Sequence, residues 1–379
     1  MFQRRLKLFK LLGFEVKVDI TWLIIAVLVT WSLARGLFPE YYPDLAPATY
    51  WWMGITGALG LFLSIIFHEL SHSLFARRHG LPMKGITLFI FGGVAEMSEE
   101  PENPRTELIM AVSGPISSVI LGFLFLLLRT AARGINLSVP IVGVIGYLAF
   151  INFFLAAVNM VPAFPLDGGR VLRALLWKWK NNLRWATRTA SRFGSGFGTV
   201  LIILAVLQIF ASNFIGGIWF FLIGMFIKNA ARMSYRQVLI RKSLEGEPVA
   251  RFMNDKPATV SPGTTVKELV EEYVYRYHYK MYPVVDDGKL RGCVTLSQIK
   301  SIPRNQWEET TVADLSQSCD RENSISTSTD AVEALKLMNQ TKKSRLLVVD
   351  GDRLVGIITL KDLLEFFSIK LDLEGEEGP

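Results

Sequence analysis

A long apolar run that ends in a cluster of ionisable side chains constrains this 379-residue chain more than any other stretch. Residues 50–67 carry no charged side chain, and His68, Glu69 and His72 follow directly. A run of about 20 apolar residues is long enough to cross the hydrocarbon core of a bilayer as a helix. Ionisable groups at the end of such a helix are costly near lipid unless they are paired or bound to metal. The run therefore predicts a membrane helix that carries a polar site.

The spacing of the two histidines in His68-Glu69-Leu70-Ser71-His72 is typical of a metal site. In a helix, His68 and His72 lie one turn apart, about 6 Å along the axis, so both imidazoles project from one face and can hold one ion. Zinc held in this way lowers the pKa of its bound water to about 7, and a carboxylate beside it, here Glu69, can take the proton and deliver hydroxide to a carbonyl. The alternative is a pair of packed or hydrogen-bonded histidines. With four histidines in the whole chain, a chance match to the motif is rare.

Composition indicates several membrane spans followed by a soluble region. Hydrophobic residues make up 50% of the chain, and the mean hydropathy is +0.32. Residues 1–242 carry 24 Lys+Arg against 11 Asp+Glu, whereas residues 243–379 carry 17 against 23. The basic excess therefore belongs to membrane flanks, and no nucleic-acid partner is expected. Six apolar segments are candidate spans: 20–33, 50–72, 107–128, 139–160, 193–210 and 214–227. The first and the last are short, and their ends are not fixed by the pattern.

Basic residues fall unevenly on the two sides of these spans. If all six cross, 21 Lys+Arg lie on the side of the N-terminus, against only Arg35, Arg129 and Arg133 on the other. By the positive-inside rule, both termini are predicted to be cytoplasmic, with the histidine motif toward the cytoplasmic end of its span. The basic start of the chain is like a signal sequence, but no convincing cleavage site follows it, so we expect a retained cytoplasmic end.

The connection between the second and third spans is predicted to be a small β-rich, membrane-associated segment. Residues 85–96 contain a Gly-Gly bend and are too short and turn-rich for another crossing. Non-helical backbone at membrane depth must be covered by protein or face a water-filled cavity. An edge strand here could bind an extended peptide by strand addition, and a plain structural hairpin is an equal alternative.

The segment after the fourth span supplies a candidate third metal ligand. Prolines and glycines break the helix within residues 159–170, and Asp167 is the one acid there, at the edge of an apolar environment. A site with two histidines needs a third protein ligand, and the remaining histidine of residues 1–242 is His79, so Asp167 is the best candidate on chemical grounds. The alternative is that Asp167 caps a helix over residues 171–179.

Taken together, these motifs resemble the site-2 protease family of intramembrane zinc metalloproteases. The resemblance rests on His68–His72, Phe91-Gly92-Gly93, Ser113-Gly114-Pro115 and the Asn159-x-x-Pro-x-x-Pro-Leu-Asp-Gly-Gly run, and it covers roughly residues 15–235. It implies one Zn²⁺ per chain on His68, His72 and Asp167, with Glu69 as general base. It also implies membrane-anchored protein substrates that are cut within or near their spans. Asn159 matches a family asparagine that is thought to position substrate or the oxyanion.

The C-terminal region contains an internal repeat. Residues 282–295 align with residues 346–359 at an offset of 64, and each copy reads as strand, Asp/Gly turn, strand, then helix. Helices are expected before each copy, over 265–277 and 330–339. This resembles a tandem CBS pair, which in many families binds adenine nucleotides between the copies. The acidic tail, residues 374–379, is expected to be disordered.

The same resemblance implies candidate ligand-binding residues in the CBS pair. A Thr and, three residues later, an Asp contact ribose and phosphate in such modules. The second copy has both, Thr359 and Asp362, whereas the first has Thr295 with Gln298 in place of the acid, so at most one well-formed nucleotide cleft is expected. A pair that only forms a homodimer or shields the active site is an equal alternative.

The predicted fold class is thus a polytopic α-helical membrane protein followed by a soluble α/β CBS pair. We expect a protease domain at 1–242, a first CBS domain at 243–312 and a second, with the acidic tail, at 313–379. The expected setting is the plasma membrane of a bacterium or archaeon. The rival interpretations are a CBS-regulated transporter or channel with a metal site, and an inactive membrane-anchored sensor. The polar intramembrane groups cluster around one metal geometry instead of lining a path across the bilayer, which disfavours the transporter.

Overall fold

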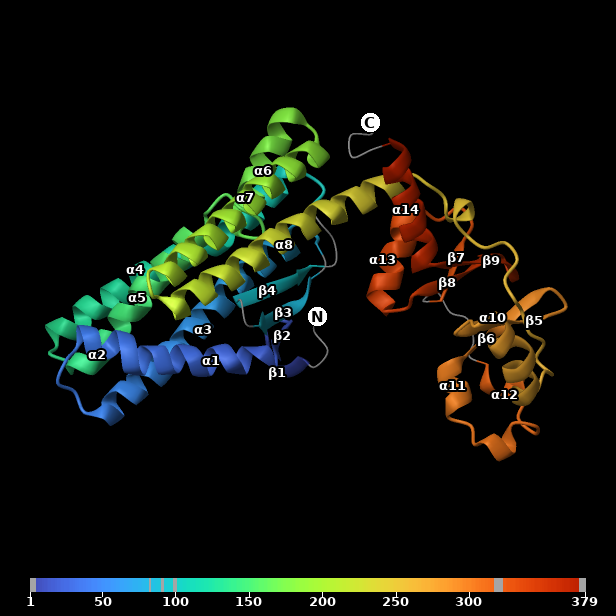
Figure 1. The fold of residues 1–379 in the computed structure, drawn as a ribbon, viewed down its shortest axis with the longest axis horizontal. Helices are drawn as coiled ribbons and strands as arrows, with labels where there is room; N and C mark the ends of the chain where they lie inside the picture. Colours follow the sequence, from blue (N-terminus) through green and yellow to red (C-terminus); the bar gives the residue numbers. More distant parts are fainter. Residues whose placement is uncertain (1–4, 82, 90–91, 98–100, 317–322, 375–379) are drawn as a thin grey trace. The chain divides into compact units, whose positions relative to one another are not determined.

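The computed structural model of the chain describes residues 5–81, 83–89, 92–97, 101–316 and 323–374. The chain forms two compact units, Met1–Val238 and Leu239–Pro379. Figure 1 shows the helices and strands of both. Phe91 of the predicted bend and residues 375–379 of the acidic tail lie outside the described part.

Six helical segments of the described chain are long and apolar enough to cross a membrane, as predicted. They are Thr21–Tyr41 (α1 Thr21–Ser32, η1 Leu33–Leu37 and α2 Phe38–Tyr41), α3 Pro47–Arg78, α4 Pro104–Gly134, α5 Val139–Asn159, α7 Leu183–Phe210 and α8 Phe214–Leu244. An asparagine is the N-cap of α4 and of α7. The side-chain oxygen of Asn103 accepts a hydrogen bond from the Thr106 amide, and that of Asn182 accepts one from the Trp185 amide. A shorter amphipathic helix, α6 Asp167–Lys180, lies between α5 and α7 in the chain.

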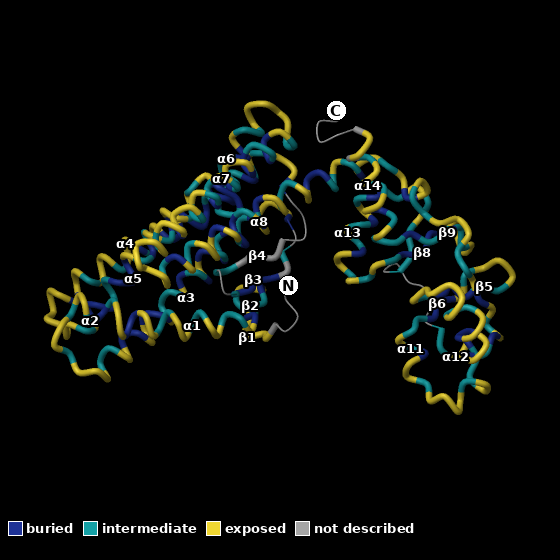
Figure 2. The backbone as a smooth tube through the Cα atoms, viewed as in Figure 1, coloured by how far each residue is buried: buried dark blue, intermediate teal, exposed yellow. Residues whose placement is uncertain are grey.

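Exposed residues run along these helices (Figure 2). Many of them are large and apolar, including Phe123 and Leu127 of α4 and Phe150 of α5. Small and polar residues are buried instead where the helices meet. In α4 the buried set includes Ser113, Gly114 and Ser118. Small residues let helices approach closely where lipid offers no hydrophobic drive for association. The helices therefore present apolar side chains outward, and small and polar residues of α4 line part of an interior that also contains apolar clusters, such as the one around Phe38, Met53 and Phe62.

A four-stranded sheet supports the helix that carries the histidine motif. Its order is β1-β2-β3-β4, with β1 Arg5–Leu11, β2 Phe14–Asp19, β3 Met83–Phe89 and β4 Gly92–Met97. Strands β2 and β3 are parallel and the other pairs antiparallel. Val16 and Val18 of β2 pack with Leu88 of β3 against Ile66 of α3. The β-rich segment expected at 85–96 is present as β3 and β4, with β4 at the edge of the sheet.

The N-terminal hairpin is not among the sequence-based predictions, which interpret the basic start of the chain, residues 1–10, only as a cytoplasmic end. Alternation was nevertheless visible in β2, where the buried Phe14, Val16 and Val18 alternate with Glu15 and Lys17. Arg77, near the end of α3, donates to the Leu12 carbonyl oxygen at 2.8 Å. The hairpin thereby holds the end of α3.

The second unit contains the predicted repeat as two hairpins in one sheet of order β5-β6-β9-β8-β7. A register shift falls between Val284 and Val285 in one hairpin and between Val348 and Val349 in the other, at the predicted offset of 64. Each copy has its own apolar core, one around Tyr282 and one around Leu346. The elements are β5 Met281–Asp286, β6 Lys289–Thr295, β7 Ser324–Ser326, β8 Arg345–Asp350, β9 Arg353–Thr359, η2 Val249–Arg251, α9 Val266–Glu268, η3 Leu269–Val274, α10 Tyr275–Tyr277, α11 Leu296–Lys300, η4 Arg304–Gln306, α12 Val312–Leu315, α13 Ala331–Thr341 and α14 Leu360–Glu374.

Candidate metal centre

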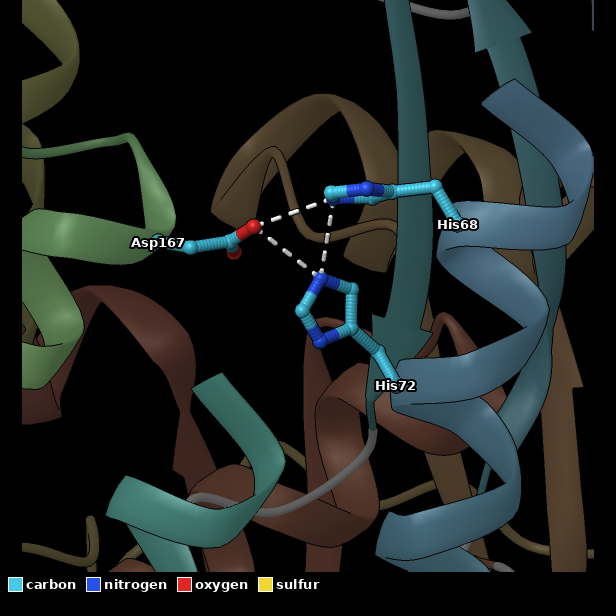
Figure 3. A group of neighbouring side chains, drawn as sticks. All are labelled: His68, His72 and Asp167. Atoms are coloured by element: carbon cyan, nitrogen blue, oxygen red, sulfur yellow. Dashed lines mark hydrogen bonds and ion pairs between the residues drawn. The ribbon is translucent and has the colours of Figure 1, made fainter. Parts of the chain in front are cut away.

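Three donor atoms from two helices meet inside the first unit (Figure 3). His68 Nε2 and His72 Nε2 of α3 lie 3.0 Å and 3.2 Å from Asp167 Oδ2 at the start of α6, and 3.2 Å from each other. Both histidines are buried. Residues 99 positions apart in the chain therefore form one cluster of metal-binding groups.

Helix α4 orients both imidazoles from behind. His72 Nδ1 lies 2.7 Å from the carbonyl oxygen of Met110, and His68 Nδ1 lies 2.9 Å from Ser118 Oγ. A carbonyl only accepts, so His72 Nδ1 carries the proton and Nε2 of the neutral ring presents a lone pair. Outer hydrogen bonds of this kind fix ring orientation and tautomer in metal sites.

The donor set fits a zinc ion. Zinc bonds of about 2.0–2.1 Å in a tetrahedral site place neighbouring donors about 3.3 Å apart, and the three separations here are 3.0, 3.2 and 3.2 Å. If both rings are neutral, His72 Nε2 carries no proton, so its contact with Asp167 Oδ2 brings two lone pairs together. A cation bound between the three atoms would turn this repulsion into attraction.

Asp167 is suited to carry the negative charge of this site. Burial alone would raise the pKa of its carboxyl. Positive charge beside it, on the imidazoles of His72 and His68 when they are protonated, outweighs burial and lowers the pKa. A cation held by the neutral rings would act in the same direction. Asp167 is the first residue of α6, and Leu166 occupies the N-cap position without a side-chain hydrogen bond. The Asp167 carboxylate faces the histidines and does not cap the helix, so the alternative interpretation of Asp167 as a helix cap is wrong.

Gly114 leaves the space in front of the two rings open. A Cβ atom at this position of α4 would lie 2.2 Å from His72 Nε2 and 2.6 Å from His68 Nε2. Such distances are far below van der Waals contact, so only glycine keeps both nitrogens accessible. The sequence-based predictions use the Ser113-Gly114-Pro115 motif without assigning a role to its glycine. In the structure, Gly114 keeps the Nε2 atoms of both histidines accessible.

Glu69 lies where β4 approaches α3. A Cβ atom at Gly93 of β4 would lie 2.7 Å from Glu69 Cγ and 3.1 Å from Ile65 Cγ2. The half-buried Glu69 side chain therefore passes directly against the backbone of the edge strand. A carboxylate next to His68 and an edge strand thus occupy the same side of α3.

Comparison with known proteins identifies the family of the chain. The family model for Peptidase family M50 matches residues 56–138 and 131–205. The chain is 32% identical to Rip3 of Mycobacterium tuberculosis over 95% of this chain and 92% of that protein. The chain belongs to Peptidase family M50. It is 33% identical to sll0528 of Synechocystis (94% of this chain, 93% of that protein) and 29% identical to zinc metalloprotease MJ0392 of Methanocaldococcus jannaschii (98% of each).

As an M50 peptidase, the chain is a multi-pass zinc metalloprotease of the site-2 type, which confirms the predicted enzyme class and its zinc cofactor. The CBS domain model matches residues 249–304 and 312–369, which confirms the tandem CBS pair. Full-length similarity to proteins named zinc metalloproteases favours the protease over the transporter or channel.

Asn159 ends α5, and its side-chain Nδ2 donates to the Leu155 carbonyl oxygen at 3.0 Å, one turn back in its own helix. In this arrangement the amide is engaged with α5. Its predicted role in positioning substrate stays a prediction.

The candidate nucleotide residues of the CBS pair cap helices. The Thr359 amide donates to Asp362 Oδ2 at 2.8 Å, and the Asp362 amide donates to Thr359 Oγ1 at 3.3 Å, at the start of α14. Thr295 and Gln298 form the equivalent capping box of α11. Gln298 therefore replaces the acid in its structural role but not in its charge. Sequence reasoning missed this role, although Thr-x-x-Asp and Thr-x-x-Gln are capping-box patterns.

Proposed function

We propose that His68, His72 and Asp167 hold one zinc ion per chain and that Glu69 is the general base of peptide-bond hydrolysis. The convergence of three donors at 3.0–3.2 Å, on rings fixed from behind by α4, is the observation that supports this most strongly. The proposed substrates are membrane-anchored proteins, cut within or near their membrane segments.

The residues of the chain divide the chemistry among them. When bound, zinc would act as a Lewis acid and lower the pKa of a coordinated water to about 7. Glu69 accepts the proton of the attacking water and returns it to the amine that leaves. The Met110 carbonyl and Ser118 hold the two imidazoles in their binding orientation throughout. Asn159 is our candidate for positioning the substrate carbonyl.

Two substitutions test these roles separately. Glu69→Gln fills nearly the same volume but cannot accept a proton, so hydrolysis of a membrane-anchored substrate should stop while zinc content stays near one per chain. Asp167→Ala should lower zinc content sharply. Hydrolysis at a near-normal rate by Glu69→Gln would remove Glu69 as the base, and full zinc in folded Asp167→Ala would remove Asp167 as a ligand.

We further propose that both chain ends are cytoplasmic, because 21 of the Lys+Arg flanking the spans fall on that side. The proposed membrane is the plasma membrane of a bacterium or archaeon, since the similar proteins come from such organisms. The proposed domains are the protease at 1–242, the first CBS domain at 243–312 and the second at 313–379.

An adenine nucleotide is our proposed regulatory ligand of the CBS pair, contacting Thr359 and Asp362 with Thr295 as the weaker counterpart. Calorimetric titration of the purified protein with ATP, ADP and AMP tests this. Asp362→Gln is a sharp variant, because Gln298 already supports the same capping box in the first copy. It should fold and lose nucleotide binding. Unchanged binding would exclude Asp362, and absence of binding by the unmodified protein would leave dimer formation or shielding as the role of the pair.

A further inference from the structure

A buried ion pair joins α6, which begins with Asp167, to α4, the helix that orients the two histidines. Arg173 Nε of α6 donates to Glu107 Oε1 of α4 at 2.6 Å, and Arg173 Nη2 contacts the same oxygen. The exposed fraction is 0% for Glu107 and 3% for Arg173. The other carboxylate oxygen, Glu107 Oε2, has no hydrogen-bond partner among the described residues. Glu107 therefore depends on Arg173 for compensation of its charge.

The place of this pair in the fold is informative. Helix α4 holds the two histidines through Met110 and Ser118, and α6 begins with Asp167. Glu107 lies one turn before Met110 in α4. The Arg173 guanidinium also lies 5.2 Å from the centre of the Phe164 ring, in the segment that leads into Asp167. The pair thus connects the helix that orients two donors with the helix and loop that carry the third.

We propose that Glu107 and Arg173 are positioning residues that hold Asp167 in register with His68 and His72. This inference rests on the proposed zinc site. Metal-binding distances tolerate errors of about 0.2 Å, so the helix that carries Asp167 needs supporting contacts that fix its position relative to α4. A buried, hydrogen-bonded arginine and carboxylate fix both the spacing and the rotation of two helices, although they add little net stability.

Zinc affinity of the full-length protein in detergent, measured by competition with a chelator, tests the proposal. Glu107→Leu/Arg173→Met removes both charges at similar volume, so that no charge stays buried alone. We expect a melting temperature of the zinc-free protein close to that of the unmodified protein, and a loss of zinc affinity of at least about tenfold. The visible absorption of the Co²⁺-substituted protein should also change, because the carboxylate ligand is displaced.

Lys267→Met/Glu308→Leu is the matched control, since Lys267 Nζ and Glu308 Oε1 form an exposed ion pair at 2.6 Å in the CBS pair. It should leave zinc affinity and the Co²⁺ spectrum unchanged. Arg173→Lys keeps the charge but loses the planar fork, so it should bind zinc more weakly than the unmodified protein. This variant decides the question if the double variant does not fold.

The proposal is overturned if the folded double variant has the zinc affinity and the Co²⁺ spectrum of the unmodified protein. If the double variant does not fold, the same result in Arg173→Lys overturns it. In either case the ion pair would be purely structural. Asp167→Ala separates this failure from failure of the zinc site itself. If Asp167→Ala also binds zinc normally, the proposed ligand set is wrong; if it loses zinc while both pair variants keep it, only the positioning role is wrong.

Discussion

Gly114→Ala should remove zinc from the protein while the chain still folds. The added Cβ atom would lie 2.2 Å from His72 Nε2 and 2.6 Å from His68 Nε2. Carbon needs about 3.5 Å from a non-bonded neighbour, so this atom is about 1 Å too close to both donors. Neither ring can withdraw easily, because the hydrogen bonds of their Nδ1 atoms, at 2.7 and 2.9 Å, hold them from the other side.

The expected loss of zinc affinity follows from how little the metal–ligand distances can change. Metal–ligand distances accept errors of about 0.2 Å, and a shift of about 1 Å is several times larger. Lost outer hydrogen bonds alone cost 10–100-fold in metal affinity, so a direct clash with two donors should cost at least about 100-fold, or ~2.7 kcal/mol. Overpacking a buried site costs about 1–3 kcal/mol. The preference of a helix for alanine over glycine, about 1 kcal/mol, offsets part of this cost, so the zinc-free variant should still fold, with an equal or lower melting temperature.

The assay is chelator competition for zinc on purified full-length protein, together with thermal unfolding of the zinc-free form. Gly196→Ala in α7 is the matched control, because a Cβ atom there meets no atom within 4 Å, and zinc affinity should be unchanged. A folded Gly114→Ala protein with unmodified zinc affinity would refute the geometry on which the metal centre rests.

Three further substitutions probe other parts of the account. Ser118→Ala should lower zinc affinity about 10–100-fold by releasing His68 Nδ1, as measured by the same competition, and no loss would show that the hydrogen bond is dispensable. Gly93→Ala should slow proteolysis while zinc is retained, because its Cβ atom would lie 2.7 Å from Glu69 Cγ and not at the zinc donors; normal activity would contradict the close approach of β4. Thr359→Ala should destabilise the second CBS copy by about 1 kcal/mol without any nucleotide, seen as a lower midpoint in urea unfolding, because the α14 cap is lost. An unchanged midpoint would argue against the capping role.

The sequence predicted those features whose signals are local. Apolar runs located the spans, the 64-residue offset located the CBS copies, and the shortage of histidines singled out Asp167. Contacts between distant segments were not predictable in this way. The Met110 carbonyl has no signature in the sequence, because any residue would supply the same atom. The parallel pairing of β2 with β3 likewise depends on a contact between segments about 70 residues apart.

Other features had a signal that was not used. Alternating buried residues in β2 follow Leu12 and Gly13, a turn with positive φ angles of 49° and 90°. This pattern is typical of a hairpin, but the basic residues around it suggested only a membrane flank. Similarly, Glu107 and Arg173 are charged residues near predicted spans, and only the folded chain reveals that they are buried together.

Anomalous diffraction at the zinc absorption edge, from crystals of the purified protein, tests the central claim most directly. The account predicts one zinc peak per chain in the first unit, about 2.0–2.2 Å from His68 Nε2, His72 Nε2 and Asp167 Oδ2. A peak bound by other residues, or zinc-loaded protein without a peak between these three side chains, would contradict it.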